Sequence, residues 1–135
     1  PETLFPGALT DTDAFVAALL ETYAPFPAEA RSGFSYAVSK GFVKWYSSAQ
    51  AERFTAAGIR IVSVSPGSVD TEMGRLEAES GAGAMVEGAN VPRWGTAQEM
   101  ADLFTYCVSD KAGYLTGTDI LNDGGVVASM RARQG

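Results

Sequence analysis

The sequence contains no histidine and only one cysteine, Cys107. Without histidine, neither a Ser-His-Asp nor a Cys-His catalytic group can form, and a zinc site with histidine ligands is excluded. A single cysteine cannot form an internal disulfide and is typical of a protein kept in a reducing cytoplasm. We therefore expect a cytoplasmic location, no bound metal, and chemistry that depends on other side chains.

Basic residues and long apolar runs are also scarce. The chain has 10 lysine and arginine residues against 16 aspartate and glutamate residues, a net charge of −6. This balance argues against a nucleic acid or an anionic membrane surface as a partner. No apolar run approaches the ~18 residues of a membrane span, and the N-terminus lacks a signal-peptide pattern. The composition, 46% apolar and 19% charged over 135 residues, predicts one modest globular domain.

The first half of the chain predicts two helices followed by a strand. Apolar periodicity and turn residues indicate an irregular lead-in at residues 1–9, followed by a helix that has N-cap candidates at 10–13 and stops near Tyr23. A loop around 31–33, a longer helix at about 35–57 and a strand at 59–65 follow. Gly58 is the natural end of the longer helix, because glycine adopts the left-handed conformation that closes many helices.

The second half predicts a polar loop with one short helix at residues 68–93, a helix from Thr96 to about Val108, and a strand from Thr118 to Asn122. The order helix, strand, helix, strand predicts a right-handed crossover between two parallel strands. A sheet of two parallel strands is rarely stable alone. We therefore expect more sheet, supplied by residues or by a partner outside this chain.

Tyr36 and Lys40 are four residues apart near the start of the longer helix, so both project from one face. A free phenol is a poor base at neutral pH because its pKa is about 10, whereas a nearby ammonium favours the phenolate. Such a pair could exchange a proton with an alcohol or a carbonyl oxygen. On spacing alone, an ordinary surface pair is the commoner interpretation.

The context of this pair changes that interpretation. Tyr36-Ala-Val-Ser-Lys40 opens a long helix, Pro66-Gly67 follows a strand, and the segment from Tyr114 to Gly125 ends in Asp-Gly-Gly. In this order the three motifs resemble the short-chain dehydrogenase/reductase family, over about residues 35–126. The resemblance implies the C-terminal portion of a doubly wound, parallel-sheet Rossmann fold of the α/β class. It also implies an oxidoreductase that transfers hydride between NAD or NADP and a secondary alcohol or ketone.

By this resemblance, Tyr36 is the general acid/base, and Lys40 supports it and binds the nicotinamide ribose. The same resemblance assigns the cofactor-contact residues at the end of the strand.

Pro66 and Gly67 would shape the turn beside the nicotinamide ring. The Val69 backbone would pair with the carboxamide, and the Thr71 hydroxyl would support the carboxamide or the pyrophosphate. Residues 72–93 would form the substrate-binding loop. The apolar residues of this loop could contact substrate or only pack the lid: Met73, Leu76, Met85 and Val86.

Several aromatic and sulfur-containing residues have simpler interpretations. Trp45 and Trp94 are more typical of core or interface positions than of ligand contacts. Trp45 and Tyr46 lie on a helix that often forms a subunit interface in the family, so a homo-oligomer is expected. Cys107 shares an apolar helical stripe with Leu103 and is expected to be buried.

The family's glycine-rich nucleotide turn, its Asn-Ala-Gly segment and its catalytic serine have no match in this chain. The positions where the family usually carries the serine are occupied by Tyr23 and Ala24. We therefore expect the serine and the N-terminal half of the enzyme to precede Pro1, with residues 1–34 as an insertion before the tyrosine. The start at proline instead of methionine is consistent with N-terminal processing or with a cut within a longer polypeptide. The residue that selects NAD or NADP would also lie in that half.

An insertion at this place looks like the bacterial 3-alpha-hydroxysteroid dehydrogenase/carbonyl reductase group. The likeness depends on the insertion, on the Pro92-Arg-Trp-Gly95 segment, and on the end from Asp123 to Met130. It implies a ketone or secondary-alcohol substrate, with steroids among the candidates; a subunit contact is the alternative role of the insertion. A different class of function also stays open, a non-catalytic subunit or interaction module that keeps the family fold.

Overall fold

The computed structural model describes residues 2–135, apart from the side chains of Glu77, Glu79 and Ser80. Pro1, before which the missing half is expected, lies outside the described residues. The elements follow in the order η1 (Glu2–Leu9), α1 (Thr12–Tyr23), α2 (Ala28–Ala49), α3 (Ala51–Ala56), β1 (Val62–Pro66), α4 (Glu72–Glu77), η2 (Ala78–Ala82), α5 (Gly83–Glu87), α6 (Ala97–Val108), η3 (Asp110–Ala112), β2 (Thr118–Asn122) and α7 (Val126–Gln134).

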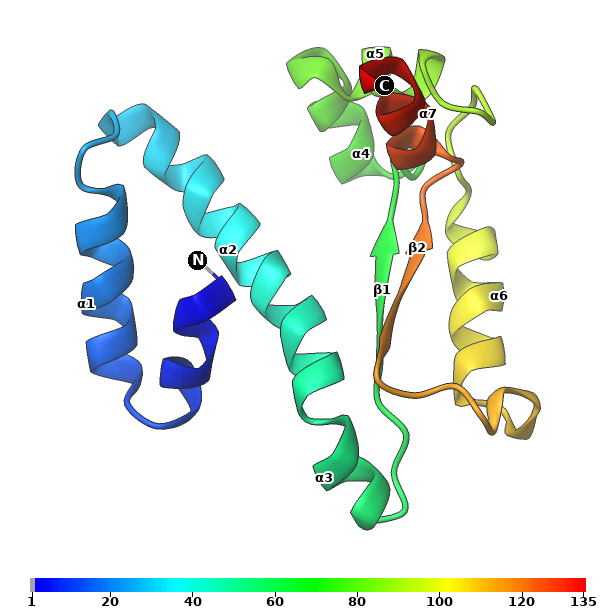
Figure 1. Cartoon of the computed structure of the whole chain (residues 1–135). Coiled ribbons are helices and arrows are strands. Elements are labelled where there is room, and N and C mark those ends of the chain that lie inside the picture. The colour runs from blue at the N-terminus through cyan, green and yellow to red at the C-terminus, as the bar shows by residue number, and fades with distance from the viewer. Residues whose placement is uncertain (1) are drawn as a thin grey trace.

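The elements are arranged around a small sheet (Figure 1). Helix α2 runs diagonally along one side of strands β1 and β2, and α6 lies on the other side. Helices α4, α5 and α7 gather at the carboxyl ends of both strands, while η1 and α1 pack against α2 away from the sheet. The end of the sheet where α/β proteins usually bind ligands is therefore covered by these three short helices.

The N-terminal segment is more regular than the sequence predicts. Residues 2–9 form the 3₁₀-helix η1 instead of an irregular lead-in. Phe5 explains this difference, since its side chain is only 1% exposed and its ring lies 5.5 Å from the ring of Phe42 and 5.7 Å from that of Trp45. Helix α1 then begins as predicted, because the Asp11 carboxylate accepts a hydrogen bond of 2.9 Å from the Ala14 amide.

Helix α2 begins earlier than predicted, at Ala28, so the expected loop at residues 31–33 is helical. The Arg31 side chain donates hydrogen bonds to the carbonyl oxygens of Ala24 and Phe26, which fixes the turn from α1 into α2. The helix is also not continuous to residue 57, because it breaks at Gln50 before the short helix α3. Gly58, with φ of 73°, follows the end of α3 as the sequence predicts.

Strands β1 and β2 are parallel, as predicted, and pair from Val62 with Thr118 to Pro66 with Asn122. The strand begins at Val62 and not at residue 59. Before this point the two segments are joined by a backbone bond from the Gly117 amide to the Ile61 carbonyl oxygen at 2.7 Å, and Gly117 has a left-handed φ of 69°. The amide of Ile61 donates to the Thr116 hydroxyl at 3.1 Å and not to a backbone carbonyl group.

A polar seam joins α2 to the sheet. The Asp119 carboxylate accepts hydrogen bonds from the hydroxyl groups of Ser63 at 2.7 Å and Ser65 at 2.9 Å, and Lys44 Nζ lies 3.5 Å away. The Ser47 and Ser63 hydroxyl groups lie 3.2 Å apart in the buried part of the seam. The residue types of strand β1 alone do not predict this seam, because its acceptor comes from β2.

The segment between the strands holds the largest departures from prediction. Residues 68–93 contain α4, η2 and α5 where one short helix is expected, with a kink at Gly81 (φ 110°). Helix α6 agrees with the prediction, because Thr96 and Glu99 form a complete capping box. The C-terminal helix α7 is not predicted, and the Asp123 carboxylate caps it by accepting from the amides of Gly125 and Val127, both at 2.8 Å.

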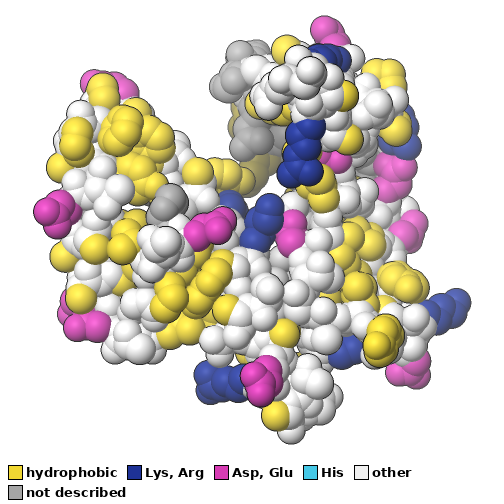
Figure 2. Space-filling model, in the orientation of Figure 1, with side chains coloured by type: hydrophobic (Ala, Val, Ile, Leu, Met, Phe, Trp, Pro, Cys, Tyr) yellow, Lys and Arg dark blue, Asp and Glu magenta, His cyan; other side chains and the backbone are white. Residues whose placement is uncertain are grey.

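The chain exposes more surface than a compact protein of its size. Its accessible surface is 9376 Å², whereas a folded monomer of 14.2 kDa exposes about 6,800 Å². Among the described residues, few apolar side chains are buried: Phe5, Val38, Val86, Cys107 and Ala112. No described helix is long and apolar enough to cross a membrane. Figure 2 shows hydrophobic side chains gathered over helices α1 and α2. Much apolar surface of the chain is therefore open to solvent.

Candidate active site

Tyr36 and Lys40 lie together on one face of α2. The Lys40 Nζ atom is 5.5 Å from the centre of the Tyr36 ring, as expected for side chains one helical turn apart. Both side chains are exposed, and Tyr36 is 65% exposed. The hydroxyl of Ser39 donates to the Tyr36 carbonyl oxygen at 2.8 Å, which gives Ser39 a role in the helix and leaves the phenol free to face outward.

A cavity of about 460 Å³ brings the Tyr36 side chain to the carboxyl end of β1. Four of the other residues singled out by the sequence line the same cavity: Pro66, Gly67, Val69 and Thr71. Lys40 does not line it and stands behind Tyr36 on α2. The structure therefore assembles five of the six predicted site residues around one space, although they come from two segments that are about thirty residues apart.

The turn after β1 is held by a close approach of two backbones. The Gly67 amide donates to the Asn122 carbonyl oxygen at 2.9 Å. A Cβ atom on Gly67 would lie 2.6 Å from the Asp123 Cα atom, which is too short for any side chain. Only glycine permits this contact, so the turn after β1, which forms the floor of the cavity, is locked against the segment that follows β2.

Val69 and Thr71 have structural partners of their own. Val69 forms a parallel bridge with Gly95, so the segment after β1 is tied to the segment before α6. The Thr71 hydroxyl caps α4 by accepting a hydrogen bond of 3.0 Å from the Gly74 amide. This capping role comes in addition to the cofactor contact predicted for Thr71.

The apolar residues of the loop at 72–93 occupy three kinds of position. Met73 and Met85 line the cavity and are 71% and 49% exposed, whereas Val86 is 7% exposed. Leu76 is 74% exposed and lies outside the cavity lining. Met73 and Met85 are therefore placed where a bound ligand could reach them, whereas Leu76 and Val86 are not.

The cavity lining includes residues that sequence reasoning did not place in the site, among them Trp94, Val126 and Val127. Trp94, expected in a core or an interface, is half-buried with its ring against Gly74 of α4. The two valines belong to the first turn of α7. An aspartate before two glycines could have signalled a capped helix, since Asp123 supplies the capping carboxylate for α7. Cys107, in contrast, is buried as predicted and is not among the residues that line the cavity.

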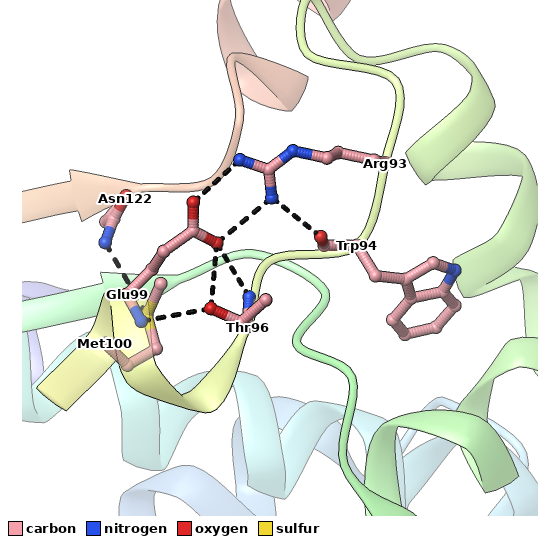
Figure 3. A network of polar contacts seen from close by, with 6 residues as sticks. All are labelled: Arg93, Trp94, Thr96, Glu99, Met100 and Asn122. Carbon is pink, nitrogen blue, oxygen red and sulfur yellow. Dashed lines mark hydrogen bonds and ion pairs between the residues drawn. The ribbon is translucent and has the colours of Figure 1, made fainter.

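Two exposed ion pairs flank the cavity. The Arg75 guanidinium hydrogen-bonds the Asp70 carboxylate at 2.7 Å and lowers the pKa of Asp70. The hydrogen bond from Arg93 is the largest cause that lowers the pKa of Glu99 to about 2, and the Thr96 amide adds to it. Figure 3 shows this second pair, with the Trp94 indole turned away from it. Within the described residues no group of His, Cys, Asp and Glu side chains could hold a metal ion.

Comparison with known proteins identifies the family. A family model described as enoyl-(acyl carrier protein) reductase matches residues 23–127, which is most of the chain and includes every predicted site residue. The chain belongs to the short-chain dehydrogenase/reductase family. Its Rossmann-type α/β fold, predicted from the motifs, is confirmed by the solved members of the family to which it is similar.

One relative in sequence and two solved structures illustrate the degree of similarity. An uncharacterized oxidoreductase, YxbG, of Bacillus subtilis is 35% identical over 108 residues, which cover 73% of this chain and 38% of that protein. A mutant 4-hydroxyisoleucine dehydrogenase, solved with NADH and succinate, matches 69% of this chain and 39% of its own length, at 28% identity and a TM-score of 0.62. A putative 2-deoxy-d-gluconate 3-dehydrogenase of Agrobacterium tumefaciens, solved with NADP, matches 70% and 39%, at 28% identity and a TM-score of 0.64. This chain therefore spans about two fifths of the length of these proteins.

Proposed function

We propose that this chain supplies the proton-transfer residues and the nicotinamide-side wall of an oxidoreductase that interconverts a secondary alcohol and a ketone with NAD or NADP. One observation carries the proposal. Tyr36 of α2 faces the same cavity as the turn after β1, at the carboxyl end of a parallel strand. In open α/β sheets, ligands bind in the crevice outside the carboxyl ends of the strands.

Tyr36 acts as the general acid/base in this proposal. Its phenol donates a proton to the carbonyl oxygen during reduction and receives the proton from the alcohol during oxidation. The Lys40 ammonium lies 5.5 Å from the ring centre, where in this proposal it orients the phenol and binds the nicotinamide ribose. The cofactor, when bound, supplies or accepts the hydride.

The cofactor would lie against the turn formed by Pro66, Gly67 and Val69. Gly67 and Val69 both line the cavity, so the polar groups of the Val69 peptide are close to the space that a nicotinamide would occupy. NADH and NADP are the cofactors named for two similar solved structures, so either cofactor fits the proposal. Met73, Met85 and Trp94 give the cavity an apolar wall that suits a substrate with a hydrocarbon body.

The N-terminal half of the family fold completes this site in our proposal. The accessible surface exceeds that of a compact monomer by about 2,600 Å². The catalytic serine and the glycine-rich turn would come from this half, with residues 1–34 as the insertion between the serine and Tyr36. We call the chain together with that half, on the same polypeptide or on another, the assembled enzyme. A cytoplasmic homo-oligomer is the expected form.

The test is the variant Tyr36→Phe in the assembled enzyme. We expect kcat to fall by about 10²–10⁴-fold, which is the usual contribution of general acid–base catalysis. Cofactor affinity should change less than about twofold, because the ring and the backbone wall remain. Tyr46→Phe is the matched control, since Tyr46 is on the same helix but packs against Phe42 and Phe54 and not in the cavity. The substrate panel should include small secondary alcohols, cyclic ketones and steroid ketones.

Retained turnover in Tyr36→Phe would reject the assignment of the general acid/base. It would leave the second candidate, a non-catalytic subunit or interaction module. That candidate is favoured by a different feature, an apolar groove of about 400 Å³ between α1 and α2. Apolar residues of both helices line it, including Phe15, Leu19, Leu20 and Val38.

A further inference from the structure

The Arg93–Glu99 ion pair has more hydrogen bonds than an ordinary surface pair. The Arg93 Nη2 atom donates to Glu99 Oε1 at 2.7 Å and Nη1 donates to Glu99 Oε2 at 3.0 Å, so the guanidinium and the carboxylate pair through two parallel bonds. Arg93 Nη1 also donates to the carbonyl oxygen of Trp94 at 3.0 Å. Figure 3 shows the guanidinium between this carbonyl group and the carboxylate. The Arg93 side chain therefore holds the Trp94 carbonyl group and, through Glu99, the first turn of α6.

Glu99 extends this network into the first turn of α6. Its Oε2 atom accepts from the Thr96 amide at 2.8 Å and from the Thr96 hydroxyl at 3.2 Å, and the Thr96 hydroxyl accepts from the Glu99 amide at 3.1 Å. A capping box requires only the bonds between the two residues of the box. Arg93 adds a third partner, which fixes the peptide groups on both sides of Gly95 to the same carboxylate.

Gly95 is the connection from this network to the cavity. Its amide donates to the Ser68 carbonyl oxygen at 3.0 Å, and its carbonyl oxygen accepts from the Asp70 amide at 2.8 Å. Val69 lies between these two bonds and forms the parallel bridge with Gly95. The position of the Val69 peptide therefore depends on the position of Gly95, which the Arg93–Glu99 pair holds from both sides.

We infer that Arg93 and Glu99 are positioning residues for the nicotinamide end of the cofactor. They act through Gly95 on the Val69 peptide, which pairs with the carboxamide in the proposed function on which this inference rests. The side chains of Arg93 and Glu99 are 56% and 43% exposed, and exposed ion pairs contribute little to folding. Loss of the pair should therefore loosen one wall of the cavity and leave the fold intact.

The test compares two ligands in the assembled enzyme. One is NADH, or NADPH if the enzyme binds it more tightly; the other is the matching fragment without nicotinamide, ADP-ribose or its 2′-phosphate. In Arg93→Met the Kd of the whole cofactor should rise by about three- to tenfold, equivalent to one displaced hydrogen bond. The Kd of the fragment should stay within about twofold, because the fragment does not reach Val69. Arg93→Lys, which keeps the charge but lacks the planar fork, should give a smaller rise.

Arg31→Met is the control, because Arg31 is also an exposed arginine that donates to backbone carbonyl groups, those of Ala24 and Phe26, but it is outside the cavity lining and does not bond the segment from Trp94 to Thr96. It should leave the Kd values of both ligands within about twofold of the parent. An equal loss for whole cofactor and fragment in Arg93→Met would assign the pair a general structural role and overturn the inference. No loss for either ligand would overturn it as well. If the parent enzyme binds neither ligand, or if Tyr36→Phe keeps its turnover, the proposed function itself fails. If the parent binds both ligands and Tyr36→Phe loses turnover, a negative result for Arg93→Met counts against this inference alone.

Discussion

Replacement of Gly67 by alanine tests the geometry of the cavity floor most directly. The added Cβ atom would lie 2.6 Å from the Asp123 Cα atom and 3.0 Å from the Asp123 carbonyl carbon, both of which belong to the backbone. A flexible side chain could rotate away from such a contact, but these atoms can yield only by a movement of the chain. Because the Asp123 carboxylate caps α7, this movement would also displace the two valines of α7 that line the cavity.

The expected cost follows from the size of this conflict. One extra methyl group in a packed site destabilises a protein by about 1–3 kcal/mol when the surroundings have to shift. For a protein of about 150–250 residues, each kcal/mol lowers the melting temperature by about 2–4 °C. Gly67→Ala should therefore melt roughly 2–12 °C below the parent enzyme. Its cofactor Kd should also rise, because the turn that faces the nicotinamide is displaced.

Gly33→Ala is the matched control for this substitution. Gly33 is inside α2, its φ is helical, and a Cβ atom there would meet no atom within 4 Å. Alanine is the better helix former, so this variant should gain up to about 1 kcal/mol. Differential scanning calorimetry of the assembled enzyme measures both variants under the same conditions. If Gly67→Ala melts at or above the temperature of Gly33→Ala, the close approach of Gly67 and Asp123 does not exist in solution.

Two further variants test other contacts of the fold. Asp119→Ala should lower the free energy of unfolding by about 1–3 kcal/mol, measured by urea denaturation, because two half-buried serine hydroxyl groups of β1 lose their acceptor; an unchanged urea midpoint would contradict the polar seam. Glu99→Gln should be less stable than the parent at neutral pH, and the difference should shrink as the pH falls. The sign follows from the pKa of Glu99, which is lowered from the ordinary value of 4.5 to about 2 in the folded protein, so the ionised carboxylate stabilises fully above about pH 4.5 and progressively less as the pH approaches 2. Melting curves of both proteins from pH 7 to pH 2.5 measure this difference, and a gap that widens on acidification would refute the reasoning.

The parts of the fold that the sequence predicts depend on local signals. The cap at Thr96, the left-handed Gly58 and the strand from Thr118 to Asn122 were identified from residues close together in the chain. The parallel pairing followed from the order of the elements. The cavity needed more than local signals, because its two parts are distant in sequence. The three motifs pointed to it through a family resemblance, and five of the six residues predicted in this way line one cavity in the structure.

The missed features depend on contacts that no local pattern contains. Residues 2–9 are helical because Phe5 is buried against rings of α2, and residues 31–33 are helical because Arg31 closes the preceding turn. Helix α7 needs the cap from Asp123, and Asp123 lies against Gly67. These two residues follow different strands, Gly67 after β1 and Asp123 after β2. In each case a distant or unexpected partner decided the structure, and local propensity alone favoured a loop.

The excess surface gives the strongest physical argument that the proposed site works only in an assembled enzyme. A standard protein interface buries about 800 Å² on each partner, whereas this chain exposes about 2,600 Å² more than a compact monomer of its mass. An excess of this size is larger than an ordinary docking patch and supports the proposal that a second part of the fold covers it. The same opening leaves Tyr36 65% exposed, so water reaches the phenol. In the proposed enzyme, the half that covers the apolar surface would also exclude this water, and folding and proton transfer would then depend on the same contact.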